Sequence, residues 1–161
     1  MFLCVFKRDN WIRSINILNN DAVNDKREFS HFDNTFPHVK IFSEAFKNSN
    51  AYFYSNPLTV NLSGIREWGN LSPLINSVRI IESLYQYRLN GLSYHKYLMY
   101  KNTALKNFIP DLLKILFYKG NTGSEYINPV KLIFFNCIYP NFYLSIAYFF
   151  LRIIKNKLKK V

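Results

Sequence analysis

The sequence predicts an α/β front part, with short strands and an amphipathic helix, followed by a mainly α-helical, basic tail. Short apolar or alternating runs typical of strands occur at residues 2–6, 51–54 and 58–62. After residue 72, apolar residues recur mainly at helical spacing. Positive charge also gathers there: residues 1–70 hold 8 Lys/Arg and 7 Asp/Glu, whereas residues 71–161 hold 13 and 3. We therefore divide the chain into residues 1–68 and an aromatic-rich tail, 69–161.

The front part begins with the apolar run Phe2–Phe6, which is followed by Lys7 and Arg8 and predicts a buried strand. A helix should follow, because apolar residues recur there at helical spacing, namely Trp11, Ile12, Ile15 and Leu18. The polar and charged residues 19–31 predict a surface loop.

An amphipathic helix over residues 35–47 is the clearest element of the front part. Asn34 or Thr35 can serve as its N-cap, and Pro37 is tolerated in the first turn. One face of this helix carries His38, Ile41, Phe42, Ala45 and Phe46. We expect this face to be buried, with His38 at its start and Asp33 in the preceding turn.

A strand pair, a linker and several helices should follow. Residues 51–54 and 58–62 predict strands on either side of Asn56 and Pro57, and residues 63–73 predict a linker. Helices are expected from Ser72-Pro73 to about Leu89, over 93–118 with a break near Pro110, and over 129–139 and 141–158 on either side of Pro140.

The apolar run from Leu132 to Ile154 contains one charged residue, Arg152, and is about long enough to cross a membrane. Pro140 would break a single helix in this run. Two shorter segments at a membrane interface fit the pattern better, because a cationic end follows at Lys155, Lys157, Lys159 and Lys160. A core helix with a solvated lysine tail is an equal alternative.

Composition and charge narrow the classes of function. The apolar share of 49% is ordinary for a globular protein. The cysteines, Cys4 and Cys137, form no CxxC motif, which favours a reducing compartment. A basic tail beside a nearly neutral front part indicates an anionic partner: a membrane surface, a phosphate-bearing substrate or nucleic acid. We expect a cytoplasmic protein, peripheral on the inner face of the cytoplasmic membrane.

Two motifs and the strand pair at 51–62 carry a family resemblance. The motifs are F-K-R-D-N-W at residues 6–11 and F-D-N-T-F-P-H-V-K-I-F at residues 32–42. Over residues 2–68 the chain resembles the C-terminal half of inverting family-2 glycosyltransferases, which have a GT-A fold and include bacterial enzymes that build surface polysaccharide. The resemblance implies an acidic residue at the start of a helix whose apolar face covers the acceptor site.

The resemblance also implies roles for single residues. Asp33 falls where the family has its general base, which takes the proton of the acceptor hydroxyl as that oxygen attacks the anomeric carbon. His38 falls at the acceptor site, and Arg66 and Trp68 are weaker candidates for contacts with the diphosphate or the sugar. Without the resemblance, Asp33 is a helix cap, His38 a core histidine, and Arg66 and Trp68 a staple in the linker.

The sequence departs from the family pattern in two ways. No D-x-D motif, which binds Mg²⁺ or Mn²⁺ in the complete enzymes, occurs in these 161 residues. The family's usual acidic pair is here Asp33 followed by Asn34. We therefore expect no metal in this chain, no activity from it alone, and a separate polypeptide or upstream reading frame that carries the nucleotide-sugar half.

Three hypotheses follow from the sequence. The first is a truncated or split glycosyltransferase that transfers a sugar from a nucleotide sugar to a surface-polysaccharide or lipid-linked acceptor. The second is a non-enzymatic, basic helical module that binds anionic membrane surfaces. A nucleic-acid-binding version of this module is weaker, because no helix-turn-helix or other recognition motif is evident. The third is a remnant without function.

Overall fold

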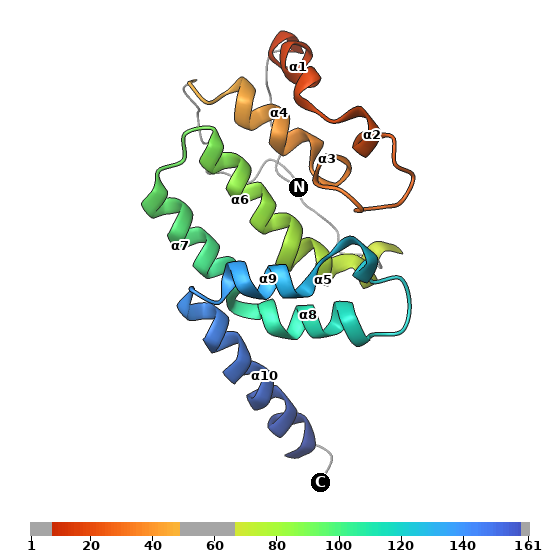
Figure 1. Ribbon diagram of the computed structural model, residues 1–161, viewed down its shortest axis with the longest axis vertical. Coiled ribbons are helices and arrows are strands. Elements are labelled where there is room, and N and C mark those ends of the chain that lie inside the picture. The colour runs from red at the N-terminus through yellow and green to blue at the C-terminus, as the bar shows by residue number, and fades with distance from the viewer. Residues whose placement is uncertain (1–7, 49–66, 159–161) are drawn as a thin grey trace, which may run out of the picture.

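The computed structural model describes residues 8–48 and 67–158, and every regular element in these ranges is a helix (Figure 1). The first range contains α1 (Arg8–Ser14), η1 (Ile15–Ile17), α2 (Asn20–Val23), α3 (Phe32–Thr35) and α4 (Pro37–Ala45). The second contains η2 (Glu67–Leu71), α5 (Ser72–Leu74), η3 (Ile75–Arg79), α6 (Ile80–Leu89), α7 (Tyr94–Ala104), η4 (Leu105–Asn107), α8 (Phe108–Phe117), η5 (Ser124–Tyr126), α9 (Pro129–Asn136) and α10 (Pro140–Leu158). Of the η elements, η3 is a π-helix and the others are 3₁₀ helices.

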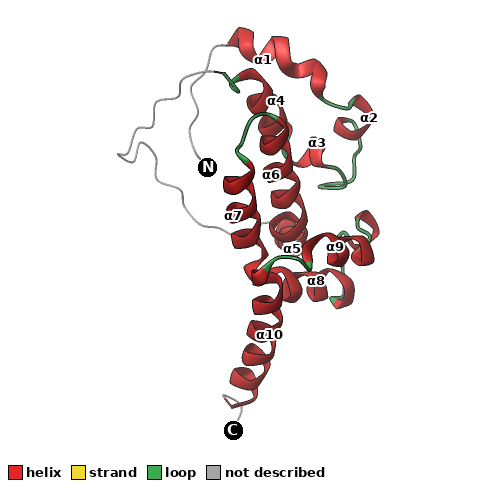
Figure 2. Cartoon of the chain, turned by 60° about the vertical axis from the view of Figure 1, so that its left-hand side comes forward, coloured by secondary structure: helices red, strands yellow, loops and turns green. Residues whose placement is uncertain are grey.

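The predicted α/β fold is wrong for the part of the chain that the structure describes. No residue in ranges 8–48 and 67–158 lies in a strand (Figure 2). The three predicted strands, at residues 2–6, 51–54 and 58–62, lie outside the described residues. In the described ranges, helices cover the apolar faces of other helices: α4 packs against α1 and α6, and α8 packs against α5 and α10. These residues therefore form a helical protein and not a GT-A remnant.

Most of the helix predictions are confirmed, with differences at the breaks. Residues 72–89 form one continuous helical stretch, α5–η3–α6. The break within 93–118 falls at η4, whereas Pro110 lies in the first turn of α8, where its missing N–H needs no partner. The predicted loop over 19–31 is wrong in part, because it contains α2. Asn19 caps that helix by accepting hydrogen bonds from two backbone N–H groups at 2.9 and 3.2 Å.

Two clusters of buried apolar side chains hold the helices together. The first joins η4 and α8 to the start of α10 and contains Leu105, Phe108, Leu112, Tyr139 and Phe142. The second joins η2, α5 and η3 to α8 and contains Leu71, Leu74, Val78 and Ile115. Ile127 and Leu132 pack against both clusters. Leu132 therefore packs the inner side of α9 against both clusters.

A buried arginine joins the first described range to the second. Arg79, at the end of η3, is 4% exposed. Its guanidinium donates to the carbonyl oxygen of Phe29 at 2.9 and 3.1 Å, to the carbonyl oxygen of Ser30, and to Glu82 at 2.8 Å. Phe29 has a φ of +59°, a left-handed conformation that costs about 1–2 kcal/mol in an L-residue. Arg79 thus holds a loop whose backbone conformation is unfavourable. The division of the chain into two parts at residue 68 stays a prediction.

Candidate functional site

Asp33, the candidate general base, lies in α3 and is 6% exposed. Its Oδ2 accepts hydrogen bonds from the backbone N–H of Asn19 and from Nζ of Lys40, both at 2.7 Å. The same Nζ lies 3.1 Å from Oδ1. The carboxylate therefore ties α3 to the cap of α2 and to α4. Because both oxygens are engaged, this geometry favours a structural role over that of a base that faces a substrate.

His38, the candidate acceptor-site residue, lies in the first turn of α4. Its ring is in edge contact with the rings of Phe36 and Phe42, at centroid distances of 6.0 and 6.4 Å. Among the described residues, no hydrogen bond or ion pair joins His38 to Asp33. The structure therefore does not bring the two candidates together as a catalytic pair, and the role of each stays a prediction.

The two weaker candidates cannot be placed at a site. Arg66 lies outside the described residues. Trp68 lies in η2, where the structure describes its backbone only. Within ranges 8–48 and 67–158, no group of three His, Cys, Asp or Glu side chains could hold a metal ion.

The outer face of α9 is the most unusual surface of the described chain. Val130 and Phe134 are 75% and 73% exposed, Phe135 is 56% exposed, and Ile138, just after the helix, is 76% exposed. A surface helix normally turns its large apolar residues toward the core. Leu132 does so, but α9 presents most of its apolar side chains to solvent. Exposed apolar clusters of this kind mark interaction surfaces.

Helix α10 begins against the core and then leaves it. Phe142 and Ser145 are buried, Ile146 and Phe149 are partly buried, and Phe150, Leu151, Ile153 and Ile154 in the later turns are exposed. Figures 1 and 2 both show the end of α10 projecting beyond the other helices. We define the α9–α10 surface as the exposed apolar residues Val130, Phe134, Phe135, Ile138, Phe150, Leu151, Ile153 and Ile154.

A helix that crosses a membrane must be both long and apolar enough to span the hydrocarbon core. Taken singly, none of the described helices has both the length and the apolar character that crossing requires. Pro129–Asn136 and Pro140–Ile154 have both when taken together, but a bend of 117° separates them.

Positive charge accompanies the α9–α10 surface. From residue 112 to residue 161 the sequence contains eight Lys or Arg and one acidic residue, Glu125. Lys131 is exposed on α9 itself, and the side chain of Lys114 on α8 is 57% exposed. Four of the eight are lysines at positions 155–160, next in sequence to the exposed turns of α10. The apolar surface is therefore part of a strongly cationic segment.

A buried lysine fixes the end of α9. Lys101 is 8% exposed, and its Nζ lies over the ring of Tyr139 at 4.7 Å and over that of Tyr97 at 5.8 Å. It also donates to the carbonyl oxygen of Phe135, in the last turn of α9, at 3.5 Å. Burial lowers the pKa of Lys101, and the aromatic rings and the helix C-terminus offset part of that cost. These contacts help to hold the orientation in which Phe134 faces outward.

The sequence left an interfacial position and a core position open for the apolar run from Leu132 to Ile154, and it did not show which side chains of α9 point outward. The Phe134-Phe135 doublet beside Lys131 was the available signal. Helical spacing alone could not decide between the two faces of α9, because both carry apolar residues. The role of Lys101 was missed as well, since Tyr139 and Phe135, which it contacts across the fold, are more than 30 residues away in sequence.

Comparison with family models, with curated proteins and with solved structures finds no match to this chain. The resemblance to family-2 glycosyltransferases accordingly stays a prediction. The function has to be inferred from the geometry of the described residues.

Proposed function

We propose that this protein is a non-enzymatic module that binds anionic lipid bilayers through the α9–α10 surface. The outer face of α9 carries this proposal, because its large apolar side chains point away from the core. Segment 129–158 contains no Asp or Glu, so nothing on it repels an anionic leaflet. Interfacial helices usually bind in this way: their apolar side chains enter the boundary of the acyl chains, and their lysines contact the lipid headgroups.

The energies involved are sufficient for reversible binding. Complete burial of a Val, Ile or Phe side chain contributes about 1.5–3 kcal/mol, so each residue on α9 that enters the bilayer partway contributes roughly 1–2 kcal/mol. A lysine near an anionic surface adds about 1 kcal/mol. Four such apolar residues contribute roughly 4–8 kcal/mol and three lysines about 3 kcal/mol, and the sum exceeds a cost of immobilisation of about 4 kcal/mol, the lower end of its range. The result is peripheral attachment that high salt should weaken.

The glycosyltransferase hypothesis stays a prediction, together with its metal and its partner polypeptide. The described geometry does not favour it, because Lys40 engages both oxygens of Asp33. Membrane attachment rests on a different set of residues and does not depend on that hypothesis.

Vesicle flotation tests the proposal. The protein should float with phosphatidylcholine vesicles that contain phosphatidylglycerol, and with pure phosphatidylcholine vesicles much less. High salt should release it. The Phe134→Ser/Phe135→Ser variant should bind at least about tenfold more weakly, because two apolar insertions are lost.

Tyr100→Ser is the matched control, since Tyr100 is an aromatic residue on α7 that is 47% exposed and lies outside the α9–α10 surface. It should bind as the unmodified protein does. Equal flotation of the two variants, or no flotation with anionic vesicles at low salt, would overturn the proposal.

A further inference from the structure

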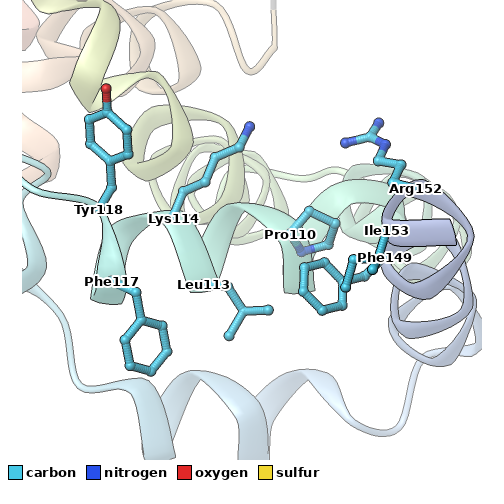
Figure 3. A pocket seen from close by; sticks show the side chains of 8 residues that line it. All are labelled: Pro110, Leu113, Lys114, Phe117, Tyr118, Phe149, Arg152 and Ile153. Carbon is cyan, nitrogen blue, oxygen red and sulfur yellow. The ribbon is translucent and has the colours of Figure 1, made fainter. Parts of the chain in front are cut away.

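Helices α8 and α10 border an open groove of about 390 Å³, a volume within the ~300–1,000 Å³ range of small-molecule sites. Its apolar lining comes from Pro110, Leu113 and Phe117 on α8 and from Phe149 and Ile153 on α10. The groove is open to solvent along its length, and part of its wall is the projecting end of α10 (Figure 3). It therefore lies next to the α9–α10 surface and not in the core.

The groove is amphipathic. In Figure 3 the polar ends of Lys114, Arg152 and Tyr118 lie along one edge, and the side chains of Leu113 and Phe117 lie toward the other. An elongated ligand with a charged end and an apolar chain would match this division. A small inorganic anion would leave the apolar lining exposed, and a neutral hydrocarbon would leave the cations unused.

The two cations are incompletely neutralised by the protein. Nζ of Lys114 is 3.8 Å from Oδ1 of Asp111, a long ion pair, and Nη2 of Arg152 donates to the neutral Oδ1 of Asn107 at 3.3 Å. Asp111 is largely covered, with a 13% exposed side chain, and its Oδ2 accepts a hydrogen bond from Ser77 at 3.0 Å. Within the described ranges Arg152 forms no ion pair, but the charge of the Asp111 carboxylate acts on both Arg152 and Lys114 and offsets part of their positive charge. The rim can therefore accept an anionic group.

We infer that this groove binds a single anionic phospholipid drawn from the bilayer. The phosphate lies between Lys114 and Arg152, and one acyl chain lies along Leu113, Phe117 and Phe149. The inference rests on the proposed membrane binding, which supplies the lipid. It goes further because the α9–α10 surface binds a bilayer through charge and apolar contact alone, whereas the groove binds one lipid molecule at a defined site. A diacyl lipid supplies both the anion and the chain that the lining requires.

Titration calorimetry with a soluble lipid separates the groove from the bilayer. The whole protein is titrated with dihexanoyl phosphatidylglycerol below its micelle concentration, and in parallel with dihexanoyl phosphatidylcholine and with glycerol phosphate. The anionic lipid should bind about tenfold more tightly than the zwitterionic lipid, because its phosphate has no choline cation to neutralise it and can pair with Lys114 and Arg152. Glycerol phosphate, which has no chain, should give no measurable binding.

Two variants and a control locate the site. Lys114→Gln/Arg152→Gln keeps most of the apolar stems and should weaken binding of the anionic lipid about tenfold. Leu113→Glu places a carboxylate against the acyl chain and should abolish binding. Lys96→Gln, which removes an exposed cation from α7, should bind as the unmodified protein does. Circular dichroism shows whether each variant is folded. If Leu113→Glu does not fold, the test rests on Lys114→Gln/Arg152→Gln.

The outcomes for the groove and for the proposed function are distinct. Flotation with anionic vesicles but no binding of monomeric lipid, or unchanged binding by Lys114→Gln/Arg152→Gln, would overturn the groove site and leave membrane attachment intact. Groove-dependent binding of monomeric lipid without flotation would support the site and overturn attachment through the α9–α10 surface. Equal binding of glycerol phosphate would show that the apolar lining has no role and would also overturn the inference.

Discussion

Arg79 provides the sharpest test of how the first group of helices is held to the second. Arg79→Met keeps an unbranched apolar stem and removes the guanidinium. The carbonyl oxygens of Phe29 and Ser30 then lose the donor that satisfies them in the folded protein. Because Ser30 is 5% exposed, water cannot easily replace that donor without opening the loop.

The size of the effect follows from those contacts. A buried polar group that loses its partner costs about 1–3 kcal/mol, so two carbonyl groups cost about 2–6 kcal/mol. Glu82 adds little, because its side chain is 40% exposed and can be hydrated when the ion pair is lost. A typical domain has only about 5–15 kcal/mol of stability, so a loss of this size is readily measured.

Urea unfolding followed by circular dichroism measures this loss. Arg79→Met should lower the midpoint by an amount that corresponds to about 2–6 kcal/mol. Arg88→Met is the control, since Arg88 is an exposed arginine on α6 that donates to the carbonyl oxygen of Leu92 at 3.3 Å and lies over the ring of Tyr94. It should cost less than about 1 kcal/mol. If both variants unfold at the midpoint of the unmodified protein, the joining role of Arg79 is refuted.

Three further substitutions test local features by the same urea measurement. Gly123→Ala should lower the free energy of unfolding by roughly 1–3 kcal/mol, because φ is +73° and a Cβ would lie 2.6 Å from Cδ2 of Leu74. Gly69→Ala is the control and should be nearly neutral, because a Cβ there would meet open space. Equal losses of stability in the two variants would contradict this explanation. Asp33→Asn should lower the free energy of unfolding by about 1–3 kcal/mol, because it weakens the hydrogen bonds to Asn19 and Lys40. An unchanged urea midpoint would contradict the structural role and favour the hypothesis that Asp33 is a catalytic base. Burial raises the pKa of Asp111 above 3.8, so its stabilising contribution is complete below about pH 4 and is lost as the pH rises through the raised pKa. Asp111→Asn should therefore gain stability relative to the unmodified protein between acidic and neutral pH, and a constant difference would exclude that titration.

The helices that sequence periodicity identified are those whose ends carry clear signals. Pro140 separates α9 from α10, as predicted, because proline can begin a helix but cannot continue one. The stretch from Ser72 to Leu89 was also predicted as one helix. Its π-helical turn, η3, was not predicted, since no sequence pattern distinguishes that turn from a regular α-helix. Yet this turn contains Arg79 and Ser77, whose partners lie on other elements.

The error in fold class has a specific origin. The α/β prediction rested on short apolar or alternating runs at residues 2–6, 51–54 and 58–62, which lie outside the described residues, and it was extended from them to the whole front part. In the structure α4 is covered by α1 and α6, and Trp11 meets Phe42 at a ring distance of 5.4 Å. Periodicity shows which face of α4 is apolar but does not show whether a sheet or a helix covers it.

The candidate sites differ in how much the sequence could reveal. The helix-capping alternative for Asp33 placed it at a helix start, but the structure has His31 and Phe36 as the N-caps of α3 and α4, and the partners of Asp33 lie 14 residues before it and 7 after it. The apolar and cationic character of residues 129–158 was plain from composition. The groove between α8 and α10 was not, because it is created by the way two helices cross. Local sequence patterns carry no information about that crossing.

Attachment to a bilayer through α9 is the central claim, and a tryptophan at position 134 tests it most directly. Phe134→Trp is mixed with phosphatidylglycerol-containing vesicles whose acyl chains are brominated, and its fluorescence is compared with that of the unmodified protein, which contains Trp11 and Trp68. Tyr100→Trp on α7 serves as the control. We predict strong quenching of the tryptophan at position 134 and none beyond background at position 100. A tryptophan at position 134 that stays unquenched while the protein floats with the vesicles would contradict the claim.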